Sequence, residues 1–385
     1  NILLIEQLPT LGSKLKATGG GRCNLSNTLD DLTFMNSFGK NGRFMRDALN
    51  LFNHNSLIEF LGDIGVETHI PDGFRIFPVT HNSSTIINAL KDELNRLNIQ
   101  IKCSTKVEEL VYENQEIVGV KTLDETISTQ NVIVATGGLG YPMLGANGDG
   151  FEFASKLGHK ITPLYPAMLP LKTKETWVAS CRADTIAKAC MKIDLPKAKK
   201  LKATGDLIFT SKGIRGPVVL DFAREITPFL EKYGEVPILV NLVKGMNEND
   251  IFAYLKKEIQ NNPDKNVIET ISSLLPNSVA KELALLAGAN IEEKFNKQTG
   301  EVRNQIVKTL AWTPLTITGH DGFKKAMITR GGVSLKDINP KTMQSKHIKG
   351  LYFCGEVVDL DGPCGGYNLQ WSFSSGYLAG HLKSE

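Results

Sequence analysis

The sequence predicts an α/β protein whose apolar strands end in glycine turns or acidic residues that lead into helices. Three segments carry this prediction: NILLIE at residues 1–6, NVIVATGGLG at 131–140 and GLYFCGE at 350–356, the last followed by a glycine pair and a helical pattern. A strand, a glycine turn and a helix N-terminus together offer backbone N–H groups to an electron-rich ligand. Dinucleotide-binding folds are built from such units.

The totals narrow the class of protein. A chain of 385 residues is long enough for two or three domains. Its 44 basic and 41 acidic residues give a net charge of +3, which carries no signal of binding to nucleic acid or to a membrane surface. The six cysteines show no CxxC pair and no zinc-like spacing. We therefore expect a cytoplasmic protein without a metal site.

Residues 1–6 read as a buried strand that ends in an acid. In a dinucleotide-binding βαβ unit, the acid at the end of the second strand, here Glu6, holds the ribose hydroxyls. The G-x-G-x-x-G fingerprint is expected about 20 residues earlier, so the first βα unit is absent from this sequence. The alternative for Glu6 is a surface acid at the end of a strand.

A triple glycine follows within LGSKLKATGGGRCNLSN, residues 11–27. Gly19–Gly21 precede Arg22, and Lys14 and Lys16 lie on the other side, so N–H donors are flanked by cations. The loop would hold a phosphate or lie beside a planar ring. It lacks the G-x-x-x-x-G-K-[ST] pattern of a P-loop, and a mobile surface loop is the alternative.

Elements of both kinds follow between residues 46 and 129. Helical spacing over 46–62 breaks near Asn53 into two helices, and Asn82 begins another. The segment GFRIFP, 73–78, reads as a turn and a short strand in which Arg75 meets an anionic substrate or forms a structural ion pair. A strand over 99–103 and a β-meander over 105–129 complete this part.

The strand at 131–134 leads into the turn Ala135–Gly138, and Asp149 is placed to cap a helix over 151–157. His159 is expected to interact with the C-terminus of that helix. We divide the chain into 1–160, an inserted part 161–318 and a return 319–385. The insert is strand-like over 161–246 and helical over 247–312. Its strand region includes a lysine-rich turn with Lys197, Lys199, Lys200 and Lys202.

The C-terminal segment repeats the strand and glycine theme most clearly. Glu356, at the end of the strand, would accept hydrogen bonds from ligand hydroxyls, and Gly365–Gly366 open a helix near Asn368. An ordinary connection between a strand and a helix is the alternative.

With these motifs located, the chain resembles the flavoproteins that include the aminoacetone oxidases and the BaiN-like flavin-dependent reductases. The resemblance covers nearly the whole chain. It implies a Rossmann-like FAD-binding domain of the glutathione-reductase type with an inserted β-barrel plus helical domain. The matching segments are TGGGRCN (18–24), FRIFP (74–78), VIVATGG (132–138), NGDG (147–150), ITRGGV (328–333), TMQSK (342–346) and the segment 350–376.

The resemblance also implies roles for residues. Glu6 would bind the adenosine ribose, the backbone at Val107 the adenine, and Glu356 the ribitol or phosphate-side hydroxyls. The N–H groups of residues 367–369 would meet the N1–C2=O edge of the flavin. The full set implied for FAD is Glu6, Lys14, Gly20, Gly21, Arg22, Cys23, Asn24, Val107, Ala135, Thr136, Gly137, Gly355, Glu356, Gly366, Tyr367, Asn368 and Leu369.

The substrate would lie near Arg22, Asn24, Arg75 and Arg215. Ser211 and Arg215 stand where many members of the family have histidine and serine, so the resemblance alone does not identify the substrate.

The expected function is an FAD-dependent oxidoreductase that passes hydride between flavin N5 and a small molecule of the amine or enone class, or NAD(P)H. No second dinucleotide fingerprint is present, so NAD(P)H would bind transiently. Oxidase and reductase activity both stay open. The sequence has no CxxxxC after its first glycine segment, which argues against a disulfide reductase. The alternatives are a flavoprotein that modifies tRNA, suggested by the lysine turn, and a non-catalytic flavin-binding protein.

Overall fold

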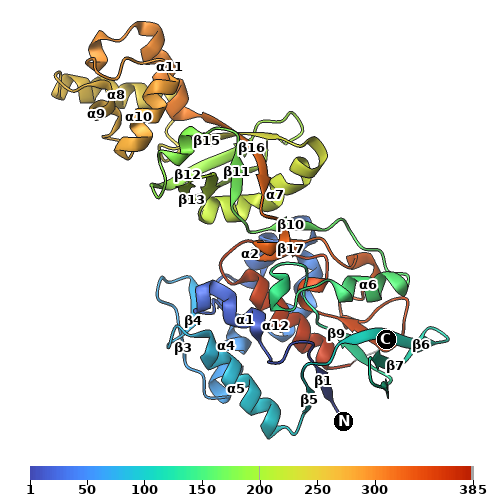
Figure 1. Ribbon diagram of the computed structural model, residues 1–385. Helices are drawn as coiled ribbons and strands as arrows, with labels where there is room; N and C mark the ends of the chain where they lie inside the picture. Colours follow the sequence, from blue (N-terminus) through green and yellow to red (C-terminus); the bar gives the residue numbers. More distant parts are fainter. Residues whose placement is uncertain (199, 383–385) are drawn as a thin grey trace. The chain divides into compact units, whose positions relative to one another are not determined.

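The computed structural model describes residues 1–198 and 200–382, which form two compact units (Figure 1). The first unit comprises Asn1–Pro166 and Ala326–Glu385, and the inserted unit comprises Ala167–Lys325. The chain thus leaves the first unit once and returns to it once. Among the described residues, no helix combines the length and the apolar composition that spanning a membrane requires.

The first unit is a mixed α/β structure. Its strands are β1 (Leu3–Ile5), β2 (Ser26–Asn27), β3 (Thr68–His69), β4 (Arg75–Pro78), β5 (Gln100–Lys102), β6 (Val107–Glu113), β7 (Glu116–Thr122), β8 (Thr126–Ser128), β9 (Val132–Val134), β10 (Tyr165–Ala167), β17 (Ile328–Arg330) and β18 (Leu351–Phe353). Its α-helices are α1 (Ser13–Ala17), α2 (Asp31–Asn36), α3 (Arg46–Leu51), α4 (His54–Asp63), α5 (Ser83–Arg96), α6 (Asp149–Lys156) and α12 (Tyr367–Gly380). Short 3-10 turns are η1 (Thr18–Gly21), η2 (Gly39–Met45), η3 (Pro142–Leu144), η7 (Leu335–Asp337) and η8 (Gly355–Val357).

Two parallel strand pairs carry the predicted strand ends, with Glu6 after β1 and glycine turns after β9 and β18. β1 pairs with β5, and β9 pairs with β18 in the register Val132 to Leu351. All three residues of β18 are buried. A parallel strand covered on both faces takes a continuous apolar sequence, which explains the run Leu351–Phe353.

Helix α12, drawn in red in Figure 1, is the central helix of this unit. Trp371 and Ser374 are almost completely buried within it. Gln370 Nε2 and Ser374 Oγ both donate to the carbonyl of Phe52, at 3.1 and 2.5 Å. Buried polar groups must be paired to avoid a desolvation cost, so these bonds fix α12 against α3.

Several local predictions are confirmed. The helical pattern over 46–62 forms α3 and α4, and the Asn53 side chain caps α4 by accepting from the N–H groups of Asn55 and Ser56. Asn82 caps α5 in the same way through Ser84. The predicted meander is the antiparallel sheet of β6, β7 and β8.

The capping role predicted for Asp149 is wrong. Helix α6 begins at Asp149 itself, and Gly148, with a φ of 90°, is the N-cap residue. The Asp149 carboxylate accepts instead from Asn147 Nδ2 at 2.8 Å. Glycine adopts the left-handed backbone conformation at no steric cost. Gly148 can therefore be the N-cap, and the helix begins one residue earlier than it would with Asp149 as the cap.

The inserted unit contains a closed six-stranded barrel in the order β11-β14-β13-β12-β15-β16. The last strand, β16, follows the helical segment and closes the barrel between β11 and β15. Closure leaves no unpaired strand edge. The strands are β11 (Leu171–Thr173), β12 (Thr185–Ile193), β13 (Lys202–Thr210), β14 (Gly213–Arg215), β15 (Val236–Asn241) and β16 (Thr313–His320).

Helix α7 begins at Pro217, as expected, and packs on the barrel strands. The further helices form the part at the upper left of Figure 1. The helices of this unit are α7 (Pro217–Tyr233), α8 (Glu248–Asn261), α9 (Val267–Ile271), α10 (Asn277–Leu286) and α11 (Gly300–Ala311), with 3-10 turns η4 (Trp177–Ala179), η5 (Phe295–Lys297) and η6 (Gly322–Lys324). Lys197 and Lys200 lie in the connection from β12 to β13. Lys199 lies outside the described residues.

Candidate functional site

Glu356 is at the centre of a hydrogen-bond network in the first unit. Its Oε2 atom lies 2.8 Å from Lys14 Nζ, and its Oε1 atom accepts from the Thr329 N–H at 2.9 Å. Thr329 Oγ1 in turn accepts from the Leu139 N–H at 2.7 Å. A carboxylate oxygen can accept two hydrogen bonds. Glu356 is therefore held in place and keeps acceptor capacity for a ligand.

The glycine turn after β9 packs directly against this network. A methyl group at Gly138 would overlap with Glu356 Oε1 and Thr329 Oγ1. Gly137 has a φ of 72° and open space where a side chain would begin. Ala135 and Thr136 complete the turn, and Thr136 lies against Gly150. The structure thus brings the turn after β9 and residue Glu356 together.

The N-terminus of α12 is the second part of the site. Gly366, with a φ of 88°, is the N-cap, and no side chain in the described part of the chain caps the helix. Helix geometry leaves the first-turn N–H groups, here of Tyr367, Asn368 and Leu369, without partners inside the helix. These donors and the helix dipole favour an electron-rich ligand.

Asn24 connects the triple-glycine segment to this helix end. With the Asn24 amide in the orientation that pairs both of its polar atoms, its oxygen accepts from the Gly366 N–H at 3.1 Å and its nitrogen donates to the Ser26 carbonyl at 3.1 Å. A side chain at Gly366 would overlap with the backbone of Ser26. Asn27 Nδ2 also donates to the Gly365 carbonyl at 3.0 Å. The predicted residues Asn24 and Gly366 are therefore in direct contact.

Ser26 supplies an unsatisfied polar group beside these residues. Its side chain is completely buried, and its Oγ atom has no hydrogen-bond partner among the described residues. A buried hydroxyl without a partner is costly. A ligand bound at the start of α12 would give the Ser26 hydroxyl a hydrogen-bond partner. Asn368 is occupied by the preceding loop, because its amide exchanges bonds with Gly362 at 2.8 and 3.0 Å.

The triple glycine forms η1, in which Gly20 has a φ of 66° and open space in front of it. Cys23, also at positive φ, is fully buried. Burial raises the pKa of the Cys23 thiol to about 11. The thiol is thus protonated at neutral pH, and a thiolate is what redox chemistry at cysteine requires.

Glu6 lies at the end of β1, where its Oε1 atom accepts from the Leu8 N–H at 2.8 Å. Its carbonyl accepts from the Thr105 N–H at 3.1 Å, close to the start of β6 at Val107. The two residues predicted near the adenosine are therefore on neighbouring segments.

The two arginines predicted near the substrate have different settings. Arg75 Nε lies 2.6 Å from Asp72 Oδ2, so it forms the structural ion pair that was its alternative. Hydrogen bonds from the backbone N–H and side chain of Arg75 lower the pKa of Asp72 to about 2. Arg215 is exposed at the end of β14 in the inserted unit.

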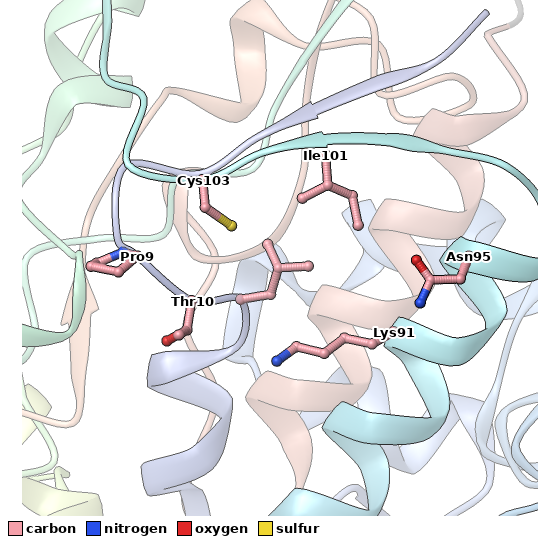
Figure 2. Close-up of a pocket in the computed structure, with 7 residues that line it drawn as sticks. Pro9, Thr10, Lys91, Asn95, Ile101 and Cys103 are labelled. Carbon is pink, nitrogen blue, oxygen red and sulfur yellow. The ribbon is translucent and has the colours of Figure 1, made fainter.

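A cavity of about 240 Å³ lies elsewhere in the first unit, between the segment after β1, helix α5 and strand β5 (Figure 2). It is smaller than the roughly 300–1,000 Å³ of pockets for drug-sized ligands. It cannot enclose a dinucleotide, and none of the predicted cofactor residues lines it. The lining residues are Pro9, Thr10, Leu11, Lys91, Asn95, Ile101 and Cys103.

A buried histidine forms a further polar cluster. His159 Nδ1 lies 3.0 Å from the Ala154 carbonyl, which agrees with the predicted interaction at the end of α6. Its Nε2 atom lies 2.7 Å from the Ser345 hydroxyl, whose oxygen accepts from the N–H groups of His347 and Ile348. His159 and Ser345 are both buried. The pair fixes the TMQSK segment and has no access for a substrate.

Two residues of the site were not predicted individually: Ser26 and Thr329. Thr329 belongs to the ITRGGV segment, so the motif pointed to its neighbourhood. Only its contacts with Glu356 and Leu139 reveal its role. Ser26 has no sequence signal beyond its proximity to Asn24.

The parallel strand pairs with their glycine turns and the inserted barrel are those of a Rossmann-type FAD-binding fold. The family described as "HI0933-like protein Rossmann domain" matches residues 1–382, and the chain belongs to this family. The resemblance and the fold class expected from the sequence are confirmed. The protein is an FAD-dependent oxidoreductase.

Three relatives match the chain over nearly its full length. The 3-dehydro-bile acid delta(4,6)-reductase of Clostridium scindens is 29% identical and covers 100% of this chain and 93% of its own. The ribosomal RNA dihydrouridine synthases of Haemophilus influenzae and Escherichia coli are 29% and 27% identical, each covering 98% of this chain and 91% and 90% of their own. Among solved structures, 3-ketosteroid-delta4-(5alpha)-dehydrogenase from Rhodococcus jostii covers 99% of this chain and 90% of its own, with 13% identity and a TM-score of 0.47. A likeness this loose says nothing about the reaction.

The residues present fit FAD at this site. The uncapped start of α12 offers donors, Ser26 Oγ is buried without a partner in the described chain, and Gly20 and Gly137 leave space beside the backbone. Each is a feature that a planar, electron-rich ring would satisfy.

Proposed function

We propose that this protein is an FAD-dependent reductase of carbon–carbon double bonds conjugated with a carbonyl group, with NAD(P)H as the electron donor. The observation that carries the proposal is the start of α12. Gly366 is held there by Asn24, and the N–H groups of residues 367–369 have no partner within the helix.

When bound, FAD supplies the hydride transfer. The chain's contribution is electrostatic and positional. The positive end of α12 favours negative charge by about 0.3–1 kcal/mol at an exposed position and up to about 2 kcal/mol in a partly buried one. Reduction adds negative charge to the cofactor, so α12 favours its reduced form. Glu356, fixed by Lys14 and Thr329, would orient hydroxyl groups on the cofactor's chain.

The names of the relatives support a reductase more than an amine oxidase. A delta(4,6)-reductase of a 3-oxo steroid acid adds hydrogen to double bonds conjugated with the C3 ketone. Dihydrouridine is uridine whose ring double bond, next to a carbonyl, has been saturated. Both names describe reduction of a double bond activated by a carbonyl group. We infer the same class of bond as the substrate of this chain.

In the overall reaction, NAD(P)H gives up a hydride and becomes NAD(P)⁺, and solvent supplies the proton. The activated double bond gains both and becomes a saturated ketone. The sequence has no second dinucleotide fingerprint. We therefore expect NAD(P)H to bind briefly and leave before the substrate is reduced.

The test is an anaerobic assay of the FAD-loaded protein with NADH or NADPH and one of three acceptors. The acceptors are a 3-oxo-4-ene steroid, a cyclic enone and a uridine oligonucleotide. We expect NAD(P)H consumption that matches the saturated ketone formed. Oxygen-dependent amine oxidation without enone reduction would contradict the proposal. Reduction of the oligonucleotide alone would move the substrate to RNA, and no turnover of any donor would leave a flavin-binding protein without catalysis.

A further inference from the structure

A pair of arginines flanks one buried aromatic ring beside the triple glycine. The guanidinium carbons of Arg22 and Arg75 lie 5.8 and 5.7 Å from the centre of the Phe77 ring. Phe77 is 2% exposed, whereas both arginines are exposed at the surface. A cation over an aromatic face is attracted by the ring's quadrupole, so the Phe77 ring helps to place both guanidinium groups.

The two arginines differ in charge balance. Arg75 is neutralised by Asp72, which accepts from its Nε atom at 2.6 Å. Arg22 forms no ion pair with a carboxylate anywhere in residues 1–198 and 200–382. Its hydrogen bond runs from Nε to the Gly19 carbonyl at 3.3 Å. The two terminal guanidinium nitrogens of Arg22 are thus left for a ligand. Together they form the planar fork of N–H donors with which arginine binds an oxyanion.

Arg22 is two positions before Asn24, the residue whose side chain contacts the start of α12. The backbone between them is constrained, because the Cys23 N–H donates to the Thr18 carbonyl at 3.1 Å. An oxyanion at Arg22 would belong to a molecule that reaches the α12 end of the proposed site.

We propose that Arg22 selects substrates that carry a carboxylate and binds that carboxylate through its guanidinium fork. This inference rests on the proposed function, since it assigns a substrate class to the same site. In this proposal Arg22 determines substrate specificity. Arg75 is the matched control, because its guanidinium also lies beside the Phe77 ring but is paired with Asp72. The 2′-phosphate of NADPH is the competing oxyanion, and the test separates the two.

The experiment uses the FAD-loaded full chain and four proteins: the unmodified protein, Arg22→Gln, Arg22→Lys and Arg75→Gln. The probes are 3-oxo-4-cholenoate and its methyl ester, which differ in the carboxylate charge and in one methyl group. Binding is measured by calorimetry without electron donor, and KM and kcat are measured with NADH and with NADPH. Thermal unfolding checks that the exposed substitutions leave the fold intact.

We expect Arg22→Gln to weaken binding of the acid and raise its KM by about ten- to a hundredfold, the effect of losing a hydrogen-bonded charge. The ester should lose much less affinity than the acid, and rates are compared per bound flavin because Arg22 also belongs to the set implied for FAD. Arg22→Lys should recover part of the affinity, because the charge remains and the fork is lost. Arg75→Gln should have a small effect on both probes.

Equal loss for acid and ester, no loss in Arg22→Gln, or a loss confined to the KM of NADPH would each overturn the inference. The binding arm separates this inference from the proposed reaction. Arg22-dependent binding of the acid without turnover would support the anion site and contradict the reductase. Turnover of acid and ester alike, unaffected by Arg22→Gln, would support the reductase and contradict the anion site.

Discussion

Lys14 Nζ lies 2.8 Å from Glu356 Oε2, although the two residues are 342 positions apart in the chain. The Lys14 and Glu356 side chains are 28% and 18% exposed. Glu356 is thereby tied to α1, and through Thr329 and Leu139 to the turn after β9. Helix α1 and the glycine turn after β9 are thus joined by one carboxylate.

Replacing Lys14 by methionine should weaken FAD binding and lower stability. A partly exposed ion pair contributes less than a buried one, so we expect a loss of about 1 kcal/mol in the free energy of unfolding. FAD affinity, measured by flavin fluorescence, should fall more than in a Lys16→Met control, because no described carboxylate pairs with Lys16. Equal FAD affinity in the two variants would show that the ion pair does not organise the site.

Gly138→Ala tests the close packing against Glu356. The added methyl group would overlap with Glu356 Oε1 and Thr329 Oγ1. Overpacking of this kind costs about 1–3 kcal/mol, measurable by urea unfolding. Gly62→Ala is the control, since Gly62 lies in α4 with open space around it. That substitution should stabilise by up to about 1 kcal/mol. A neutral Gly138→Ala would contradict the packing described here.

Ser26→Ala separates a ligand contact from a structural one. Ser26 Oγ is buried and has no partner in the described chain, so its loss should leave the cofactor-free protein as stable or more stable. FAD affinity should nevertheless decrease. In Ser374→Ala, by contrast, the bond to the Phe52 carbonyl is lost and stability should fall by about 1 kcal/mol. Unchanged FAD affinity in Ser26→Ala would remove Ser26 from the site.

His159 should make the protein acid-sensitive. Burial lowers the pKa of His159 in the folded protein, an effect that the Ala154 carbonyl only partly offsets. Well above the ordinary histidine pKa of about 6.5, His159 is neutral in both the folded and the unfolded protein, and stability is unaffected. As the pH falls below that value, the unfolded state binds the proton first and unfolding becomes more favourable.

Urea midpoints measured between neutral and mildly acidic pH should therefore decline, and His159→Gln should decline less steeply. His54 and His320 also have lowered pKa values through burial, so part of the slope should remain. An identical pH slope in His159→Gln would contradict the role of His159.

The elements that the sequence predicts well are set by neighbouring residues. The apolar run Leu351–Phe353, the asparagine caps at Asn53 and Asn82, and the meander each follow from a local pattern of side chains. The predicted N-cap of α6 was wrong by one residue. Glycine and aspartate both occur at helix N-caps, and the sequence alone does not decide between Gly148 and Asp149.

The candidate site itself depends on contacts between distant segments. Nothing near Glu356 in the sequence indicates Lys14 as its partner, and nothing near Gly366 indicates Asn24. Closure of the barrel by β16 after a helical segment is likewise a long-range pairing. Glycine motifs located the ends of the strands, whereas the bonds that join those ends became visible only in three dimensions.

The most direct test of the account is a single-turnover experiment without oxygen. The FAD-loaded protein is first reduced by one equivalent of NADPH and then mixed with 3-oxo-4-cholenoate. The account predicts that the flavin returns to its oxidised spectrum as one equivalent of saturated ketone forms. The account would be contradicted if the reduced flavin were not reoxidised by any enone while an amine reduced the oxidised flavin.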